Sequence, residues 1–143
     1  MSKLNRLFLF ISLLSFVFSC SKQTRIEDKI SGKWILEEMR IVDGQGFTYY
    51  LDNVGGELDL NFDENTSSGI VFFQSNDVAN GQAYSIDFNG NILDIDSGLE
   101  VLNLYVNQEI VPFSLVLFNS KDLVIEYYDF PNYQLRKFIF KRN

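Results

Sequence analysis

The chain of 143 residues contains no histidine, one cysteine and two prolines, and these shortages exclude several kinds of function. Without an imidazole there is no histidine base, no Ser-His catalytic pair and no histidine metal site. The single cysteine, Cys20, has no partner for a disulfide within the chain, so packing must stabilise the fold. We therefore expect a protein that is not an enzyme and that holds no cofactor or metal.

Carboxylate pairs are the acid–base option that remains. Asp94 and Asp96 are two residues apart, as are Glu57 and Asp59, but strand alternation places both pairs on a solvated face. The stretch from Asp94 to Gly98 is faintly similar to a calcium loop, yet it lacks the spaced glycine and the closing glutamate of such loops. We expect these side chains to be solvated acids.

Basic residues are also scarce, and none lies between Ile41 and Ser120. Beyond residue 19 the chain has ten Lys and Arg against 19 Asp and Glu. A chain this acidic repels phosphates, so nucleic acid and anionic lipid headgroups are not expected partners. The negative charge is compatible with a basic protein partner, but acidic side chains on the solvated faces of strands explain it equally well.

The N-terminus has the pattern of an export signal. Lys3 and Arg6 precede an apolar run from Leu7 to Phe18. A membrane-spanning helix needs about 20 apolar residues, so this run is too short to be a permanent span. We therefore expect the segment to direct export of the protein.

The end of this segment, Val17-Phe18-Ser19-Cys20, resembles the lipobox of bacterial lipoproteins, in which the cysteine is lipidated and becomes the mature N-terminus. Val17 stands where leucine is commonest and Phe18 where a small residue is preferred, so ordinary signal-peptidase cleavage is the alternative. The resemblance implies a lipoprotein signal peptide over residues 1–19 and a lipid anchor at Cys20 with a polar tether to residue 30. It also implies a location in the bacterial cell envelope. Ser21 is compatible with the outer membrane.

Residues 31–143 have the pattern of one all-β domain. Polar and apolar residues alternate strictly in Glu57–Asp63, Tyr84–Phe88 and Leu123–Tyr127, as one buried and one wet face require. Asn89-Gly90 predicts a hairpin turn. Further turn signals, including Asp52–Gly56 and Asn80-Gly81, recur about every 8 to 15 residues. This spacing predicts a single antiparallel up-and-down barrel of about eight strands, with a β-sandwich as the alternative.

The segment Ile30–Leu36 resembles the Gly-x-Trp signature of the lipocalins, through Gly32 and Trp34. In that family a basic residue of the last strand lies over the tryptophan and closes one end of the barrel. The resemblance assigns this structural role to Arg142, with Arg136 in reserve, and a guanidinium over an indole contributes roughly 0.5 to 2 kcal/mol. The chain has no Thr-Asp-Tyr motif, so the ligand sites of the family are not transferred to it.

A barrel of this size either fills its interior with side chains or holds one small ligand. The period of two places one set of apolar residues on the inner face, and five of its aromatics are candidate ligand-lining residues. The inner-face set comprises Leu58, Leu60, Phe62, Phe72, Tyr84, Ile86, Phe88, Phe113, Leu115, Ile125 and Tyr127, and the lining candidates are Phe62, Tyr84, Phe88, Phe113 and Tyr127.

Two functions follow from these patterns. The first is an envelope lipoprotein whose barrel binds a small apolar or amphipathic molecule. The second is a non-enzymatic interaction module, an accessory subunit or inhibitor with a filled barrel, which uses its acidic loops or the aromatic run Tyr127–Tyr133 against a partner. The identity of the ligand or partner and the oligomeric state are not written in any motif.

Overall fold

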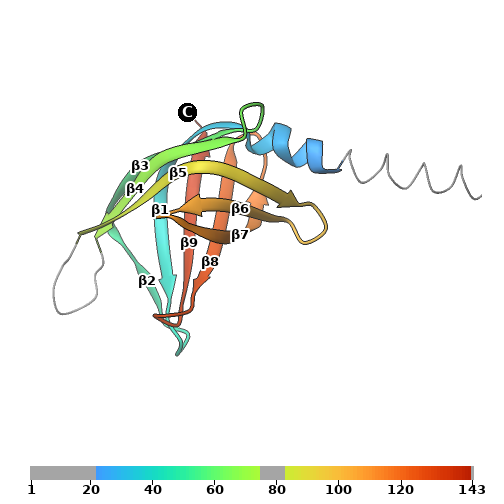
Figure 1. Ribbon diagram of the computed structural model, residues 1–143. Helices are drawn as coiled ribbons and strands as arrows, with labels where there is room; N and C mark the ends of the chain where they lie inside the picture. The colour runs from blue at the N-terminus through green and yellow to red at the C-terminus, as the bar shows by residue number, and fades with distance from the viewer. Residues whose placement is uncertain (1–21, 75–82, 143) are drawn as a thin grey trace, which may run out of the picture.

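The computed structural model describes residues 22–74 and 83–142. These residues form a short helix followed by nine strands (Figure 1). The predicted signal peptide, Cys20 and the turn signal at Asn80-Gly81 lie outside the described residues. The strands are β1 (Gly32–Val42), β2 (Thr48–Tyr50), β3 (Asp52–Asn61), β4 (Thr66–Gln74), β5 (Ala83–Asp96), β6 (Val101–Val106), β7 (Glu109–Phe118), β8 (Asp122–Asp129) and β9 (Gln134–Arg142).

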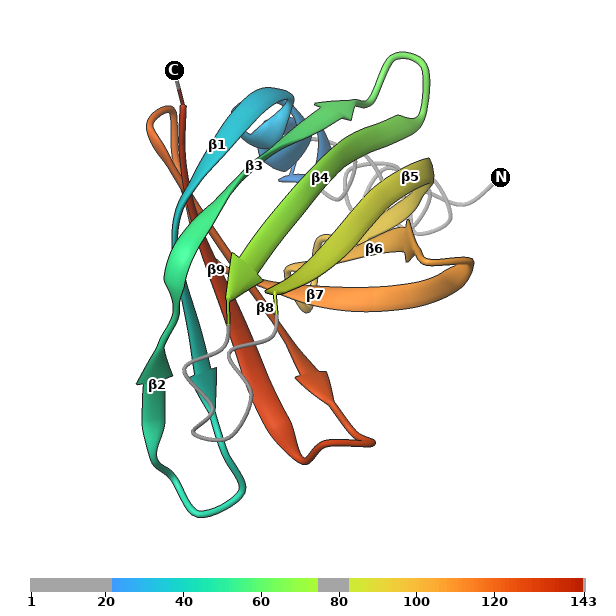
Figure 2. The same cartoon turned by 90° about the vertical axis from the view of Figure 1, so that its left-hand side faces the viewer.

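Every strand pairs antiparallel with its sequence neighbour from β3 onward, and β1 pairs with β9 to close the sheet. β2 lies along the end of β1, opposite Arg40–Val42, and β3 lies along its beginning, opposite Gly32–Ile35. Together β2 and β3 therefore occupy one position, and the nine strands make an eight-stranded barrel (Figure 2). The predicted all-β up-and-down barrel is confirmed, and the sandwich alternative is wrong.

The core follows the predicted alternation in most strands. The largest fully buried side chains are Trp34, Phe88, Phe113, Phe138 and Phe140, which come from β1, β5, β7 and β9. Their burial on the inner side of a closed sheet is the main source of stability, because each apolar Å² removed from water contributes about 25 cal/mol.

Phe72 was expected on the inner face and is instead 48% exposed, whereas Phe73 is buried. The run Ile70-Val71-Phe72-Phe73 is apolar on both faces, so its period could not tell inside from outside. The outward ring of Phe72 packs over Gly55 in the paired position of β3, and a Cβ at Gly55 would lie 2.4 Å from that ring. A glycine on the neighbouring strand therefore makes room for an outward aromatic.

The hairpin predicted at Asn89-Gly90 is wrong, because both residues lie within β5. Gly90 has a φ of +144°, and the ring of Tyr105 in β6 occupies the space where its Cβ would stand. The pairing of β5 with β6 shifts register between Phe88 and Ile92. The glycine therefore marks a bend that lets the 14-residue strand curve around the barrel.

The hairpin turn in this region lies at Asn107-Gln108, between β6 and β7. Both residues have a positive φ, 49° and 68°, as a two-residue type I′ turn requires. A second expected turn, Asp52–Gly56, is also wrong, since those residues belong to β3. β3 is irregular there, with a register shift between Asp52 and Gly55. The polar and glycine residues of Asp52–Gly56 therefore correspond to an irregular part of β3 and not to a turn between strands.

Residues 22–30, expected as a polar tether, form a helix that packs on the barrel. Ile26 and Ile30 lie four residues apart, so they share one helix face, and they are 2% and 0% exposed. Lys22 lies 3.5 Å from Glu100 in the β5–β6 turn. The helix is therefore part of the domain, and the domain begins before residue 31.

Candidate ligand pocket at the mouth of the barrel

The two ends of the barrel differ in chemistry. Because the strands alternate in direction, the turns 43–47, 107–108 and 130–133 gather at one end, which we call the mouth. The turns 62–65, 97–100 and 119–121 gather at the other end with the helix, and we call it the closed end.

The closed end is organised around Trp34. This side chain is fully buried, and its Nε1 donates a 2.8 Å hydrogen bond to the carbonyl of Ile30 at the end of the helix. Arg142 lies over the indole with its Cζ 4.4 Å from the ring centroid. Its Nη2 donates to the carbonyl oxygens of Lys29 (2.8 Å) and Ser31 (2.9 Å). Arg142 therefore joins the last strand to the helix and to the start of β1.

Gly32 adopts a φ of +105° where the chain leaves the helix and begins β1. This left-handed conformation suits glycine and turns the backbone so that Trp34 points inward. Arg136, held in reserve for the position over Trp34, lies elsewhere, in the wall of the pocket at the mouth. The closed end is thus held together by Trp34, Arg142 and the helix.

At the mouth, β7 and β8 separate. They pair only from Ser114↔Glu126 to Phe118↔Leu123, while the first half of β7 pairs with β6 alone. Pro112 lies in that first half, and because proline has no N–H it cannot donate a hydrogen bond to β8. The ladder ends two residues after Pro112, and the two strand ends diverge toward the mouth.

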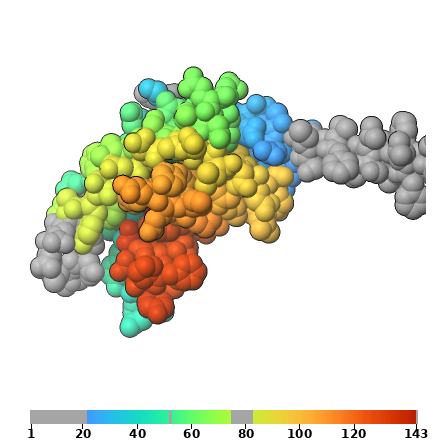
Figure 3. All heavy atoms as spheres, viewed as in Figure 1, coloured from blue at the N-terminus to red at the C-terminus, as the bar shows by residue number. Residues whose placement is uncertain are grey.

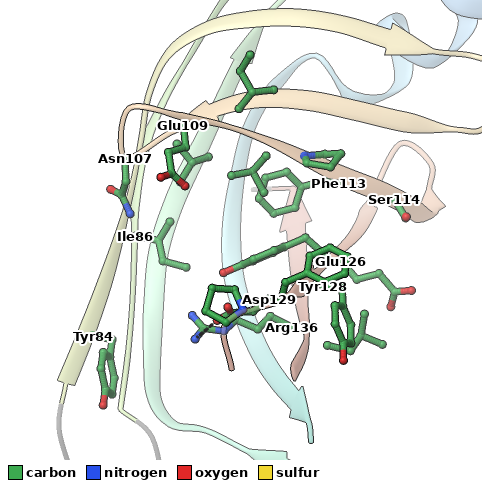
Figure 4. A pocket seen from close by; sticks show the side chains of 18 of the residues that line it. Tyr84, Ile86, Asn107, Glu109, Phe113, Ser114, Glu126, Tyr128, Asp129 and Arg136 are labelled. Atoms are coloured by element: carbon green, nitrogen blue, oxygen red, sulfur yellow. Dashed lines mark ion pairs between the residues drawn. The ribbon is translucent and has the colours of Figure 1, made fainter. Parts of the chain in front are cut away.

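A pocket of about 650 Å³ occupies this divergence and is partly open to solvent. On the face drawn in Figure 3, the orange surface of the β6–β7 hairpin lies above the red surface of β8 and β9. Residues from both hairpins and from β4 and β5 line the pocket (Figure 4). They are Phe73, Tyr84, Ser85, Ile86, Val106, Asn107, Glu109, Ile110, Val111, Pro112, Phe113, Ser114, Glu126, Tyr127, Tyr128, Asp129, Phe130, Pro131, Leu135 and Arg136.

The pocket wall is largely apolar and aromatic. Phe73, Ile86 and Phe113 are buried side chains that face it from inside the barrel. Tyr127 meets the ring of Phe113 edge-on, with centroids 5.2 Å apart, and stacks on Phe138 at 6.1 Å. These rings are fixed by packing, so the wall is preformed.

Three of the five candidate lining residues lie in this wall: Tyr84, Phe113 and Tyr127. Phe88 does not line the pocket. It is fully buried, 6.0 Å from Phe113 and 6.3 Å from Phe138 between ring centroids, so it belongs to the core. Phe62 is also outside the pocket, because it belongs to the turn at the closed end.

Tyr84 lies at the rim of the pocket, on the same face of the sheet as its paired residue Phe73. It is 47% exposed, and its ring stacks on buried Phe73 with centroids 5.6 Å apart. In β5 the inward-facing side chains are buried only from Ile86 onward. A residue at the start of a strand at the mouth stays in contact with water whichever face it occupies.

An ion pair lies in the pocket wall. Nη2 of Arg136 is 2.6 Å from Oδ2 of Asp129, and the two side chains are only 18% and 12% exposed. Burial raises the pKa of the neighbouring Tyr127 above its ordinary value, and the Arg136 guanidinium partly opposes that shift. Below pH 10 Tyr127 is therefore a neutral phenol in an apolar wall.

Sequence reasoning missed Arg136 and Asp129 as pocket residues. Their positions on either side of the turn 130–133 could have indicated them, because this turn pairs β9 with β8 and places Arg136 opposite Tyr127. A second pair joins Lys137 to Glu126 at 3.1 Å, and Glu126 also lines the pocket. Only the opening between β7 and β8 shows that Glu126, Asp129 and Arg136 border a pocket.

Two of the carboxylates considered for metal or acid–base chemistry, Asp94 and Asp96, have structural partners. Asp94 accepts a hydrogen bond from the side-chain amide of Asn103, and Asp96 accepts the backbone N–H groups of Gly98 and Leu99 in the β5–β6 turn. Within residues 22–74 and 83–142, no three His, Cys, Asp or Glu side chains cluster as a metal site requires. In the same residues no helix is long and apolar enough to cross a membrane.

Comparison with known proteins gives matches at the level of structure alone. No protein-family model matches the chain, and no curated protein matches it. A lipocalin-like protein from Bacteroides uniformis is similar at a TM-score of 0.45 and 13% identity, covering 80% of this chain and 99% of that one. A redesigned β-barrel is similar at the same score and identity, covering 83% of this chain and 96% of the other. We take no function from either.

Proposed function

We propose that the protein is a lipid-anchored lipoprotein of the bacterial cell envelope whose barrel binds a small apolar or amphipathic molecule. The observation that supports this proposal is the pocket at the mouth. Its volume of about 650 Å³ lies within the range of small-molecule sites, roughly 300 to 1,000 Å³, and its wall combines aromatic side chains with a few polar groups.

The position of the helix supports an orientation for the anchored protein. Cys20 precedes the helix by two residues, so a lipid on Cys20 would lie within about 7 Å of the helix start along the chain. The helix packs at the closed end, opposite the pocket. In this proposal the mouth therefore faces away from the membrane and takes its ligand from the aqueous side.

A second candidate function has an observation in its favour. Large apolar side chains are exposed on the mouth loops, namely Phe47, Phe130 and Tyr133. The β1–β2 and β8–β9 loops lie against one another, because a Cβ at Gly44 would stand 3.5 Å from the carbonyl oxygen of Tyr133. Exposed aromatic side chains on neighbouring loops suit contact with another protein, as the interaction-module hypothesis requires.

Native mass spectrometry of the freshly purified protein tests the first function. We expect a co-purifying small molecule, or uptake of one from an envelope lipid extract. Ile86→Trp should abolish uptake because it fills the pocket from the barrel wall, whereas Val116→Trp, at an exposed position of β7 outside the pocket, should not. A protein that stays bare in every sample contradicts ligand binding and favours the interaction module.

A further inference from the structure

The charges around the pocket are unevenly distributed. Three acidic residues line it, Glu109, Glu126 and Asp129, and one basic residue, Arg136. The chain has no Lys or Arg from residue 42 to residue 119, a stretch that includes all of β3, β4, β5, β6 and β7. The side of the mouth built by β5, β6 and β7 therefore has a negative potential that attracts cations.

The charge of Arg136 is already balanced by a carboxylate, although its Nε is buried without a hydrogen-bond partner among the described residues. Its guanidinium is 2.6 Å from the Asp129 carboxylate, and both side chains are mostly shielded from water. An anion at this guanidinium would lie beside the shielded Asp129 carboxylate, and the repulsion between the two like charges opposes its binding. In Figure 4 the two side chains lie together at the lower side of the pocket.

Glu126 is also neutralised, since its Oε2 lies 3.1 Å from the Nζ of Lys137. Glu109 differs from both. It is exposed at the start of β7, and no ion pair involves it among residues 22–74 and 83–142. Figure 4 shows Glu109 at the upper side of the pocket, beside Asn107. Among the described residues that line the pocket, Glu109 is thus the charged side chain that has no ion pair.

The rim also offers aromatic faces. Tyr128 and Phe130 form an edge-to-face pair with centroids 4.9 Å apart, and Phe130 is 74% exposed. The face of an aromatic ring attracts ammonium groups within about 6 Å of its centroid. Ile110, next to Glu109, is 62% exposed and extends the apolar rim. An unpaired carboxylate and exposed rings border the same opening.

We infer that the pocket selects an amphiphilic organic cation, with its apolar body against the aromatic wall and its ammonium group at the Glu109 side of the mouth. This inference rests on the proposed ligand-binding function and names the class of ligand. It excludes alkyl carboxylates, sulfates and phosphates as preferred ligands.

The test compares three probes that share a decyl chain, each used below its micelle concentration: decyltrimethylammonium, decyl maltoside and decyl sulfate. Binding to the purified protein is measured by isothermal titration calorimetry at low and moderate salt. We expect the cation to bind at least about fivefold more tightly than the neutral probe, as one charge contact in water gives, and the anion to bind most weakly. Added salt should reduce the preference.

The variant Glu109→Gln should lower the preference for the cation to near that for the neutral probe. Glu64→Gln changes the net charge equally but lies in the turn 62–65 at the closed end, so it should leave the preference unchanged. Equal binding of the three probes, or tighter binding of the sulfate, overturns the inference while leaving a ligand site in place. Failure of all three probes to bind overturns the ligand-binding function as well.

Discussion

Arg142 connects three parts of the closed end, so its replacement is the sharpest test of how that end is held together. In Arg142→Met the guanidinium over Trp34 is lost together with two hydrogen bonds to the carbonyls of Lys29 and Ser31. The methionine keeps an apolar side chain above the indole. The variant therefore measures the contribution of the positive charge and its hydrogen bonds, because the methionine still covers the indole ring.

The expected loss can be worked from these contacts. A cation–π pair at an exposed residue contributes about 0.5 to 1 kcal/mol. Each hydrogen bond adds about 0.5 kcal/mol, at the low end of its range because water can replace an exposed donor. The free energy of unfolding should therefore fall by about 2 kcal/mol. For a domain of this size that lowers Tm by roughly 8 °C.

Urea unfolding followed by tryptophan fluorescence measures this directly, because Trp34 is the only tryptophan and lies beneath the substituted side chain. Circular dichroism at the same urea concentrations reports the sheet. Lys141→Met is the matched control, since it removes an adjacent cation whose partner is Asp122 on the exposed surface. A loss no larger for Arg142→Met than for Lys141→Met would refute the role assigned to Arg142.

Three further substitutions test other parts of the structure. The hydroxyl of Ser67 is buried without a hydrogen-bond partner, so Ser67→Ala should raise the free energy of unfolding by about 1 kcal/mol, seen as a higher urea midpoint; a lower midpoint would indicate a partner in solution. Gly90→Ala should destabilise by about 1 to 3 kcal/mol, because φ is +144° and the Tyr105 ring fills the space; thermal unfolding measures this, with exposed Asn91→Ala as control. The folded-state pKa of Tyr127 is raised above the ordinary value of 10.0, so its contribution to stability is present below pH 10 and is lost as pH rises through the folded-state pKa. In alkaline urea titrations Tyr127→Phe should lose stability less steeply than wild type above pH 10, and parallel curves would contradict the burial of this phenol.

The barrel was predictable because long strands with one wet face have a period that local sequence displays. β8 has this property, and its residues Leu123, Ile125 and Tyr127 point inward as expected. Prediction of the buried face failed where the two faces are equally apolar, as in Ile70–Phe73, because alternation then does not distinguish inside from outside. Prediction of the turn failed at Asn89-Gly90, because positive φ serves a bend within a strand as well as a hairpin.

The site was less predictable than the fold. An aromatic on an inner face can line a cavity or fill it, and Phe113 and Phe88 have the same sequence signature with opposite outcomes. The sequence indicates only a short helical turn at Ile26–Ile30, and the full helix at residues 22–30 was missed for a related reason. Its only apolar signal is the pair Ile26 and Ile30, and two residues become a helix face only when a barrel end lies beneath them.

The place of the pocket follows from how hydrogen bonding is distributed around the barrel. The barrel has nine pairs of neighbouring strands, and in the β7–β8 pair the hydrogen-bonded ladder runs only from Ser114 to Phe118 of β7. Pro112 lies just beyond this ladder and has no backbone N–H to donate. Separation of β7 from β8 at this point therefore loses few hydrogen bonds. The other half of β7 stays fixed through its six paired residues on β6. The fold therefore opens where a backbone donor is missing, while Trp34, Arg142 and the helix hold the opposite end closed.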